Sequence, residues 1–444
     1  MVTEIVKAAN EYQAAFREVR HSSPTAAWVE LVRGSAMDRF EQLGFPTVAN
    51  EDWKYTNLAP FVKQGISPAV RPQSSRQLKT EIATHQYPET GNTRVVLVNG
   101  FMSEELSSLS GLGDVVVIDL FEAIADAQYG KIAREYLARN TNYHDNGLTA
   151  LNTAFLQSGV FVLVPRNTTL EAPLQITFVS SASAPRSTSF PRVLVVSEEN
   201  SSATIIEDYV SIGDEPYATN GVVEVVLGDG ARLEHYRVQR ENKNAVHLAT
   251  TAAKLGRSSS YNTTSITLGG QLSRHDISVV MDHEGAECWV DGLYIVGSNQ
   301  HADTHSVIDH KQPNCKSHQL YKGILDGNGR AVFNGKIFVR PGAQKTDVMQ
   351  TNKNLLLSTQ ARVDTKPQLE IFADDVKCAH GAAVGQIDQE ELFYLQTRGI
   401  NTALARNLLT YGFAEEVIEK IKVESIRAQL DESVLNQLHT RLQV

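Results

Sequence analysis

Residues 192–210, RVLVVSEENSSATIIEDYV, and residues 221–238, GVVEVVLGDGARLEHYRV, carry the pattern that decides the fold. Each consists of two short β-rich runs separated by a turn that contains Gly, Asn, Asp or Ser. Comparable turn-then-strand units recur at roughly 26 to 29 residues, a spacing typical of a solenoid repeat, around Ala203, Ala231, Ser260 and Ala286. A sandwich of as many short strands would look similar, but the near-constant period favours a β-solenoid. The next similar unit, near Arg330, comes later than this period, which predicts an insertion in one coil.

The same pattern divides the chain into three parts: a mostly helical region at residues 1–159, a β-rich core at 160–386 and a helical domain at 387–444. The helical domain is predicted to begin with Asp388 as N-cap, because Glu391 follows three residues later, as in a capping box. The open edges of such a core must be capped or paired with another protein.

In the first part, a helix is predicted with Ser23 as its N-cap, Pro24 at its first position and Gly44 just past its end. Further helices are expected near residues 120–140 and 148–157. Nothing in this region has the pattern of a catalytic site.

Charge and cysteine content exclude several classes of function. The 444 residues carry a formal net charge of −10, and no apolar run approaches the length of a membrane span, so neither nucleic acid nor a membrane is an expected partner. The start of the chain lacks the pattern of a secretory signal, which favours the cytoplasm or an organelle. The cysteines, Cys288, Cys315 and Cys378, are scattered and form no CxxC, which excludes a self-contained zinc or cluster motif.

The stretch ADDVKCAHGA, residues 373–382, combines acid, thiol and imidazole groups. If the backbone is extended, Cys378 and His380 point to the same face, Asp374 joins them, and Lys377 points away. This set offers at most three ligands, whereas an iron–sulfur cluster needs about four, mostly thiolates. The stretch is therefore half of a metal site, or else a buried cysteine beside a hydrogen-bonded histidine.

Two other groups of residues suggest different functions. Residues 301–318 contain four histidines and Cys315, which raises the alternative of a stand-alone zinc protein. Their spacing matches no zinc template, and rings bonded along a polar β surface explain them equally. Asp374 and Asp375 with Arg362 resemble the acid and base groups of polysaccharide-active solenoid enzymes, which raises the alternative of such an enzyme.

Several longer stretches resemble one protein family. Residues 370–409, EIFADDVKCAHGAAVGQIDQEELFYLQTRGINTALARNLL, residues 321–347 and residues 350–358 are similar to the SufB/SufD family of iron–sulfur cluster assembly proteins. EDWKYTNL, residues 51–58, resembles the N-terminal mark of the SufD branch. The resemblance covers nearly the whole chain. It implies a right-handed parallel β-helix core between an N-terminal helical region and a C-terminal helical domain.

The resemblance also implies a function. The chain would be a non-catalytic scaffold subunit that pairs with a SufB-like β-helix protein through the cores. A SufC-like ABC-type ATPase would bind the C-terminal helical domain, where the expected contact residues are Asp388, Glu391, Phe393, Tyr394 and Arg398.

By its place in the family motif KCxHG, His380 is a candidate ligand of iron or of a nascent cluster at the interface with the SufB-like partner, and the role of Cys378 is less secure. Ala379 departs from the Ser that is common at its position. The isolated chain is expected to hold no cofactor stably and to be able to form a homodimer. A flavin is a candidate cofactor of the complex, although no GxGxxG occurs here. The expected location is the cytoplasm or the plastid stroma.

Overall fold

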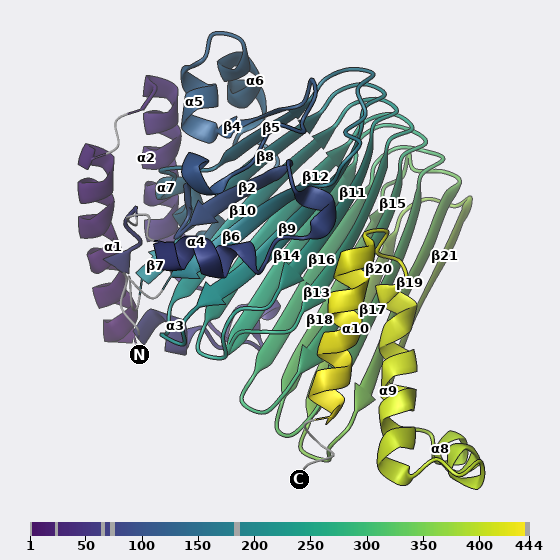
Figure 1. Ribbon diagram of the computed structural model, residues 1–444. Coiled ribbons are helices and arrows are strands. Elements are labelled where there is room, and N and C mark those ends of the chain that lie inside the picture. Colours follow the sequence, from purple (N-terminus) through teal and green to yellow (C-terminus); the bar gives the residue numbers. More distant parts are fainter. Residues whose placement is uncertain (1, 23–24, 64–66, 72–75, 182–186, 440–444) are drawn as a thin grey trace.

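Two long parallel sheets wind around a shared interior in the computed structural model, which describes residues 2–22, 25–63, 67–71, 76–181 and 187–439 (Figure 1). Through most of the core the chain alternates between the sheets, so that each sheet pairs every second strand. The result is a parallel β-solenoid of about 7 turns with helices toward both ends of the chain. The predicted β-solenoid is confirmed.

Sheet A, the 11-stranded sheet, has the order β20-β18-β16-β14-β12-β10-β8-β5-β4, with β1 and β7 off this path. Its strands are β1 (Ser67–Pro68), β4 (Val116–Asp119), β5 (Val160–Val164), β7 (Ser187–Ser189), β8 (Arg192–Ser197), β10 (Ala218–Leu227), β12 (Val246–Leu255), β14 (Leu272–Met281), β16 (His301–His310), β18 (Arg330–Val339) and β20 (Arg362–Ile371).

Sheet B, the 10-stranded sheet, has the order β21-β19-β17-β15-β13-β11-β9-β6-β2-β3. Its strands are β2 (Arg94–Val98), β3 (Phe101–Met102), β6 (Leu174–Ser181), β9 (Ser202–Ile212), β11 (Arg232–Gln239), β13 (Ser260–Thr267), β15 (Glu287–Val296), β17 (Lys316–Leu325), β19 (Thr346–Leu356) and β21 (Val376–Gly385). Residues before 160 thus supply strands to both sheets as well as helices.

One corner of the solenoid is built from residues with positive φ, each between a strand of sheet A and the next strand of sheet B. These residues are Asn167, Asn200, Gly230, Ser258, Gly285, Asn314 and Lys345. The backbone N–H of each donates to a carbonyl in the following coil, as Asn314 does to Gln344 at 2.9 Å. Gly and Asn adopt this left-handed conformation more easily than other residues, which explains the turn chemistry of the repeat.

The predicted insertion near Arg330 is wrong, because one coil was overlooked. Lys316 in β17 pairs with Glu287 in β15, whereas Arg330 in β18 pairs with His301 in sheet A. Strand β17 therefore continues the series at its normal interval. It opens with the polar run Lys-Ser-His-Gln, which conceals its strand character.

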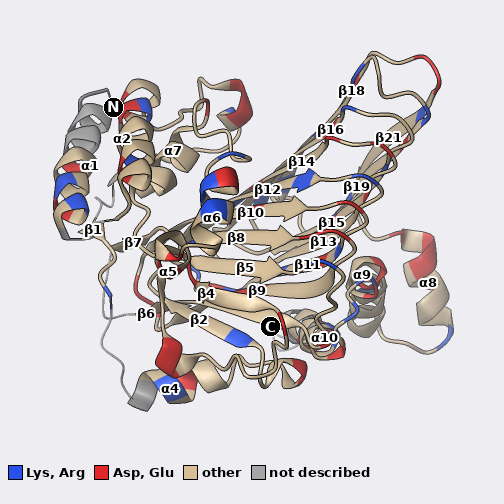
Figure 2. Ribbon diagram, turned by 90° about the horizontal axis from the view of Figure 1, so that it is seen from above, with Lys and Arg blue, Asp and Glu red and all other residues tan. Residues whose placement is uncertain are grey.

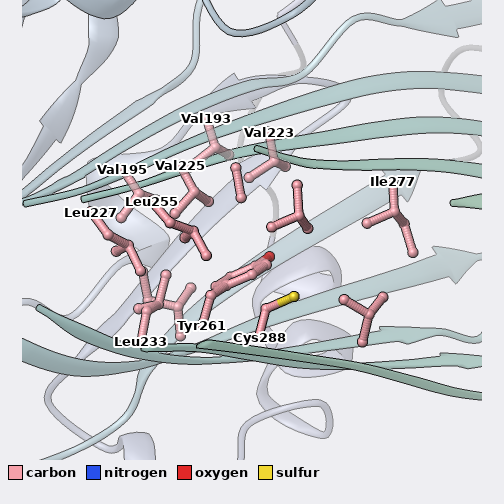
Figure 3. Packing of buried hydrophobic residues seen from close by; sticks show 14 of the residues in the cluster. Val193, Val195, Val223, Val225, Leu227, Leu233, Leu255, Tyr261, Ile277 and Cys288 are labelled. Carbon is pink, nitrogen blue, oxygen red and sulfur yellow. The ribbon is translucent and has the colours of Figure 1, made fainter. Parts of the chain in front are cut away.

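The interior of the solenoid changes character along its length. In the middle coils, apolar side chains of both sheets meet, among them Val193, Val223, Leu233 and Tyr261 (Figure 3). Full burial of one such aliphatic side chain contributes about 1.5–3 kcal/mol to stability. Toward β21 the interior also holds buried amides, including that of Gln350.

Most helices of the first part cover the solenoid toward the end where the chain enters it (Figure 1), whereas residues 51–53 reach later strands of sheet A. They are α1 (Val2–Ser22), α2 (Ala27–Leu43), η1 (Glu51–Trp53), α3 (Ala59–Lys63), α4 (Arg76–Ala83), η2 (Pro88–Thr90), η3 (Glu104–Leu106), α5 (Leu120–Ala125), α6 (Tyr129–Tyr136) and α7 (Gly147–Ala154). The predicted cap residues Ser23 and Pro24 lie outside the described residues. The described helix α2 begins at Ala27, and Gly44 ends it with a φ of 65° as predicted.

The single helix expected near residues 120–140 is instead two short helices. The Asp126 carboxylate accepts hydrogen bonds from the backbone N–H groups of Gln128 and Tyr129, at 2.7 and 2.9 Å. This local side-chain bonding ends α5 and starts α6, because it offers the backbone an alternative to helical pairing.

The C-terminal helices are α8 (Gln389–Thr397), α9 (Thr402–Ile418) and α10 (Glu424–His439). Helices α9 and α10 pack on the outer face of sheet B, where Val417 and Ile421 meet Tyr236 and Leu293. Helix α8 stands away from the sheets, and its first turn is acidic (Figure 2). Asp388 caps α8 by accepting bonds from the N–H groups of Glu390 and Glu391, which confirms the predicted N-cap. Within the described ranges, no helix combines the length and apolar character of a membrane span.

Candidate functional site

The solenoid ends in an open edge formed by β20 and β21. In the described part of the chain, β21 pairs only with β19, and β20 pairs only with β18. Large apolar side chains are exposed at this end, with Met349 at 52%, Phe372 at 57% and Val384 at 47%. Unpaired N–H and C=O groups beside exposed apolar side chains make a surface suited to another chain.

Cys378 and His380 lie in this last strand. Cys378 pairs with Val348 and His380 with Gln350, and both residues occupy the face that looks into the solenoid. Cys378 is half-buried against the core, and this burial raises the pKa of its thiol, with Asp347 adding to the effect. His380 is exposed because no further coil covers it. The structure therefore places a thiol and an imidazole on one face, as the extended-strand prediction required.

The expectation that Asp374 joins this pair is wrong. Strand β21 begins at Val376, so Asp374 lies in the bend before it and leaves the alternation of the strand. Among the described residues, no three His, Cys, Asp or Glu side chains come together in a way that could hold a metal ion. Cys378 and His380 thus have no third group of these types beside them among the described residues.

The histidines of residues 301–318 do not form a zinc site, because each has its own surroundings. His301 contacts the Thr56 hydroxyl at 2.9 Å, and His305 pairs with Asp303 at 3.0 Å, both on the outer face. His310 contacts the Ser317 hydroxyl at 2.8 Å in the interior. His318 stacks on Trp289, with ring centroids 5.7 Å apart. The zinc alternative loses its basis, since these rings are spread over two faces and two strands.

The acid and base groups of the enzyme alternative are also separated. Arg362 begins β20, while Asp374 and Asp375 follow its far end. A strand of this length spans roughly 30 Å at about 3.3 Å per residue. These three side chains cannot act together on one substrate.

The proposed contact residues for an ATPase are grouped on and around α8. Phe393 and Tyr394 are 66% and 57% exposed, and the Arg398 guanidinium lies over the Tyr394 ring at 5.2 Å from its centroid. Glu391 and Tyr394 line a shallow groove that Leu409 of α9 completes. Asp388 caps the helix and so sets where this surface begins.

Residues 51–58 form a network on sheet A that the sequence did not predict. Arg274 of β14 lies over the Trp53 ring at 3.7 Å from its centroid and donates to the Asp303 carboxylate at 2.7 Å. The Thr56 hydroxyl donates to the same oxygen, Oδ2 of Asp303, at 2.6 Å. A cavity of about 740 Å³ lies beside it, between the N-terminal region and sheet A. The only sequence signal for this network was the stretch EDWKYTNL, and that stretch does not indicate that its partners lie in β14 and β16.

Comparison with known proteins gives consistent matches over most of the chain. Residues 178–413 match the family model "SUF system FeS cluster assembly, SufBD core domain", and residues 6–176 match "SufBD protein N-terminal region". An iron–sulfur cluster assembly SufBD family protein of Synechocystis is 34% identical over 97% of this chain and 95% of its own length. The iron–sulfur cluster assembly protein SufD of Escherichia coli is 32% identical over 89% of this chain and 90% of its length. The chloroplastic protein ABCI7 of Arabidopsis thaliana is 31% identical over 92% and 86%, respectively.

Proposed function

Since the chain belongs to the SufBD family of SUF iron–sulfur cluster assembly proteins, and to its SufD type, we propose that it is the non-catalytic scaffold subunit of a cluster-assembly complex. The nascent cluster, or iron on its way to it, is the cargo of this complex. The proposed partners are a SufB-like β-helix protein and a SufC-like ATPase. The proposed location is the cytoplasm or the plastid stroma, in line with the bacterial and chloroplastic relatives.

The observation that carries the proposal is the incomplete ligand set on an unpaired edge. Cys378 and His380 stand on the last strand, where a second solenoid could pair with β21 and add its own ligands. An iron–sulfur cluster requires about four protein ligands, more than this edge provides. The isolated chain is proposed to form a homodimer through the same edge.

Helix α8 is proposed to be the docking surface for the ATPase, and α9 connects it to sheet B. The Lys322 ammonium of β17 donates to the Phe413 carbonyl at 2.9 Å and pairs with the Glu416 carboxylate. Lys420 pairs with the buried Asp291 of β15 at 2.8 Å. A nucleotide-driven movement of α8 would pass through these ion pairs to the sheet whose last strand carries His380.

The test is cluster formation by the reconstituted complex with His380→Ala. The chain would be co-expressed with a SufB-like and a SufC-like partner, purified, and supplied with iron and a sulfur donor. We expect the variant to co-purify with both partners but to lose about tenfold or more of its cluster yield, since even second-shell changes at metal sites cost 10–100-fold. Cluster absorbance and iron per complex are the measurements.

His283→Ala is the matched control, because His283 is an exposed histidine in a turn away from β21. It should keep wild-type yield. Wild-type cluster yield in an intact His380→Ala complex would remove the ligand role and leave the scaffold role. Failure of the wild-type chain to co-purify with either partner would refute the scaffold role itself.

A further inference from the structure

A row of buried polar side chains leads through the solenoid to His380. The Gln350 side-chain N–H donates to the Gln319 carbonyl oxygen at 2.8 Å, and the Gln319 N–H donates to the Ser306 hydroxyl at 2.8 Å. All three residues are buried, with exposed fractions of 1%, 2% and 1% for Gln350, Gln319 and Ser306. In the next coil, the residue in register with Gln350 is His380.

The row has a direction, and its last acceptor is free. Each amide N–H₂ group points away from the open end, so that Oε1 of Gln350 is buried without a hydrogen-bond partner. A buried carbonyl left unpaired is unfavourable, because it has lost its hydrogen bonds to water and gained none in return. The neighbouring amides of the same strand differ: the Asn352 and Asn354 side chains use both their oxygen and their nitrogen.

Gly335 of β18 lies close against this row of side chains. A Cβ atom at Gly335 would lie 2.4 Å from Nε2 of Gln350 and 3.0 Å from Oε1 of Gln319. Any larger residue at this position of β18 would displace the row. Glycine at position 335 therefore keeps Gln350 where its oxygen lies beneath the last coil.

We propose that Gln350 is a positioning residue for His380: its side-chain carbonyl accepts the ring N–H and directs the other ring nitrogen toward the interface. Paired residues of adjacent strands project from the same face about 4.8 Å apart, so a turn of the imidazole toward the interior brings its N–H to the Gln350 oxygen, a hydrogen bond that the two groups do not form in this structure. A neutral imidazole has one N–H and one lone pair, so an acceptor on one nitrogen fixes the lone pair on the other. A metal ligand needs this lone pair, and ligating histidines commonly donate their second nitrogen in this way. The proposal rests on the ligand role of His380 proposed above.

The experiment is nitrogen NMR of the histidine rings in the full-length chain, labelled with ¹⁵N-histidine and assigned with His380→Ala. In the wild type we expect one tautomer of His380, and in Gln350→Met a mixture of both. Gln368→Met is the control, since this amide lies on the outer face of β20, bonded to Asn334, and should not change the His380 signals.

Cluster yield in the reconstituted complex is the second readout, and Gln350→Met should lower it by about 10–100-fold. A tautomer mixture in the wild type, or His380 signals unaltered by Gln350→Met, would overturn the positioning role. Both NMR results are obtained without cluster assembly. They can therefore be told apart from a failure of the proposed ligand role, which would appear as a normal cluster yield with His380→Ala.

Discussion

At the scale of single residues, the Asp303 carboxylate beneath the 51–58 segment has a strongly lowered pKa. Burial alone would raise its pKa, but the Arg274 guanidinium, His305 and the Thr56 hydroxyl outweigh burial and lower the pKa below its usual range. Asp303 thus joins β16 to β14 and to the N-terminal region. The carboxylate is stabilised in the folded protein more than in the unfolded chain.

Replacement of this carboxylate tests how its ionisation makes the free energy of unfolding depend on pH. Because the folded pKa of Asp303 lies below the unfolded value of about 3.9, its stabilising contribution is present above about pH 4 and is lost as the pH falls further. Asp303→Asn should lower the free energy of unfolding by about 1–3 kcal/mol near pH 7, with a smaller difference near pH 3. Urea unfolding at a series of pH values measures this.

Asp364→Asn is the control, because Asp364 is exposed on the same face of sheet A. Its effect should stay within about 0.5 kcal/mol at every pH. An Asp303→Asn effect that does not change with pH would show that the ionised carboxylate is not the stabilising species.

At the scale of elements, the corner residues with positive φ decide how each coil turns. Most of these positions hold Gly or Asn, but Lys345 adopts a φ of 57° without either advantage. Its N–H still donates to the Asp375 carbonyl at 2.6 Å, which ties this corner to the turn before β21. The last coil is therefore held at a strained corner.

Lys345→Gly should stabilise the protein by about 1 kcal/mol, because the left-handed conformation costs a non-glycine residue roughly 1–2 kcal/mol and glycine regains most of it. Asn314→Gly, at the equivalent corner one coil earlier, should gain less, because asparagine tolerates positive φ. Urea unfolding of both variants gives the comparison. An equal gain, or a loss with Lys345→Gly, would contradict the assignment of strain to Lys345.

At the scale of the whole molecule, Arg240 joins all three parts of the chain. Its guanidinium pairs with the Asp208 carboxylate at 2.8 Å and donates to the Gln429 carbonyl of α10 at 2.7 Å and the Tyr87 hydroxyl at 3.3 Å. Asp208 is fully buried, and burial raises the pKa of its carboxyl group despite the opposing effect of Arg240. Arg240 is thus one of the contacts that hold α10 on the solenoid.

Arg240→Met should destabilise the protein by about 3–5 kcal/mol, because it leaves a buried carboxylate unpaired. Backbone amides of α10 should also exchange faster, since the helix loses one of its polar contacts with the solenoid. Arg257→Met, which breaks the exposed pair with Glu284, is the control and should cost less than about 1 kcal/mol. Equal effects of the two substitutions in urea unfolding and hydrogen exchange would exclude the joining role of Arg240.

Patterns within a few residues determined the repeat, the turn chemistry, the cap of α8 and the shared face of Cys378 and His380. These depend on backbone conformations and strand alternation, which neighbouring residues decide among themselves. The predictions for β17 and for Asp374 were wrong, because the start of a strand depends on where a neighbouring coil pairs with it.

Only the tertiary structure decided which distant residues meet. Thr56 reaches Asp303, and Gln350 lies beneath His380, because the register of every coil, set by its hydrogen bonds to the previous one, places them there. That register depends on the lengths of all the intervening turns, so no short segment of the sequence determines it. The sequence alone therefore placed Cys378 and His380 on one face, and the fold decided that both stand on an open edge above an unpaired amide.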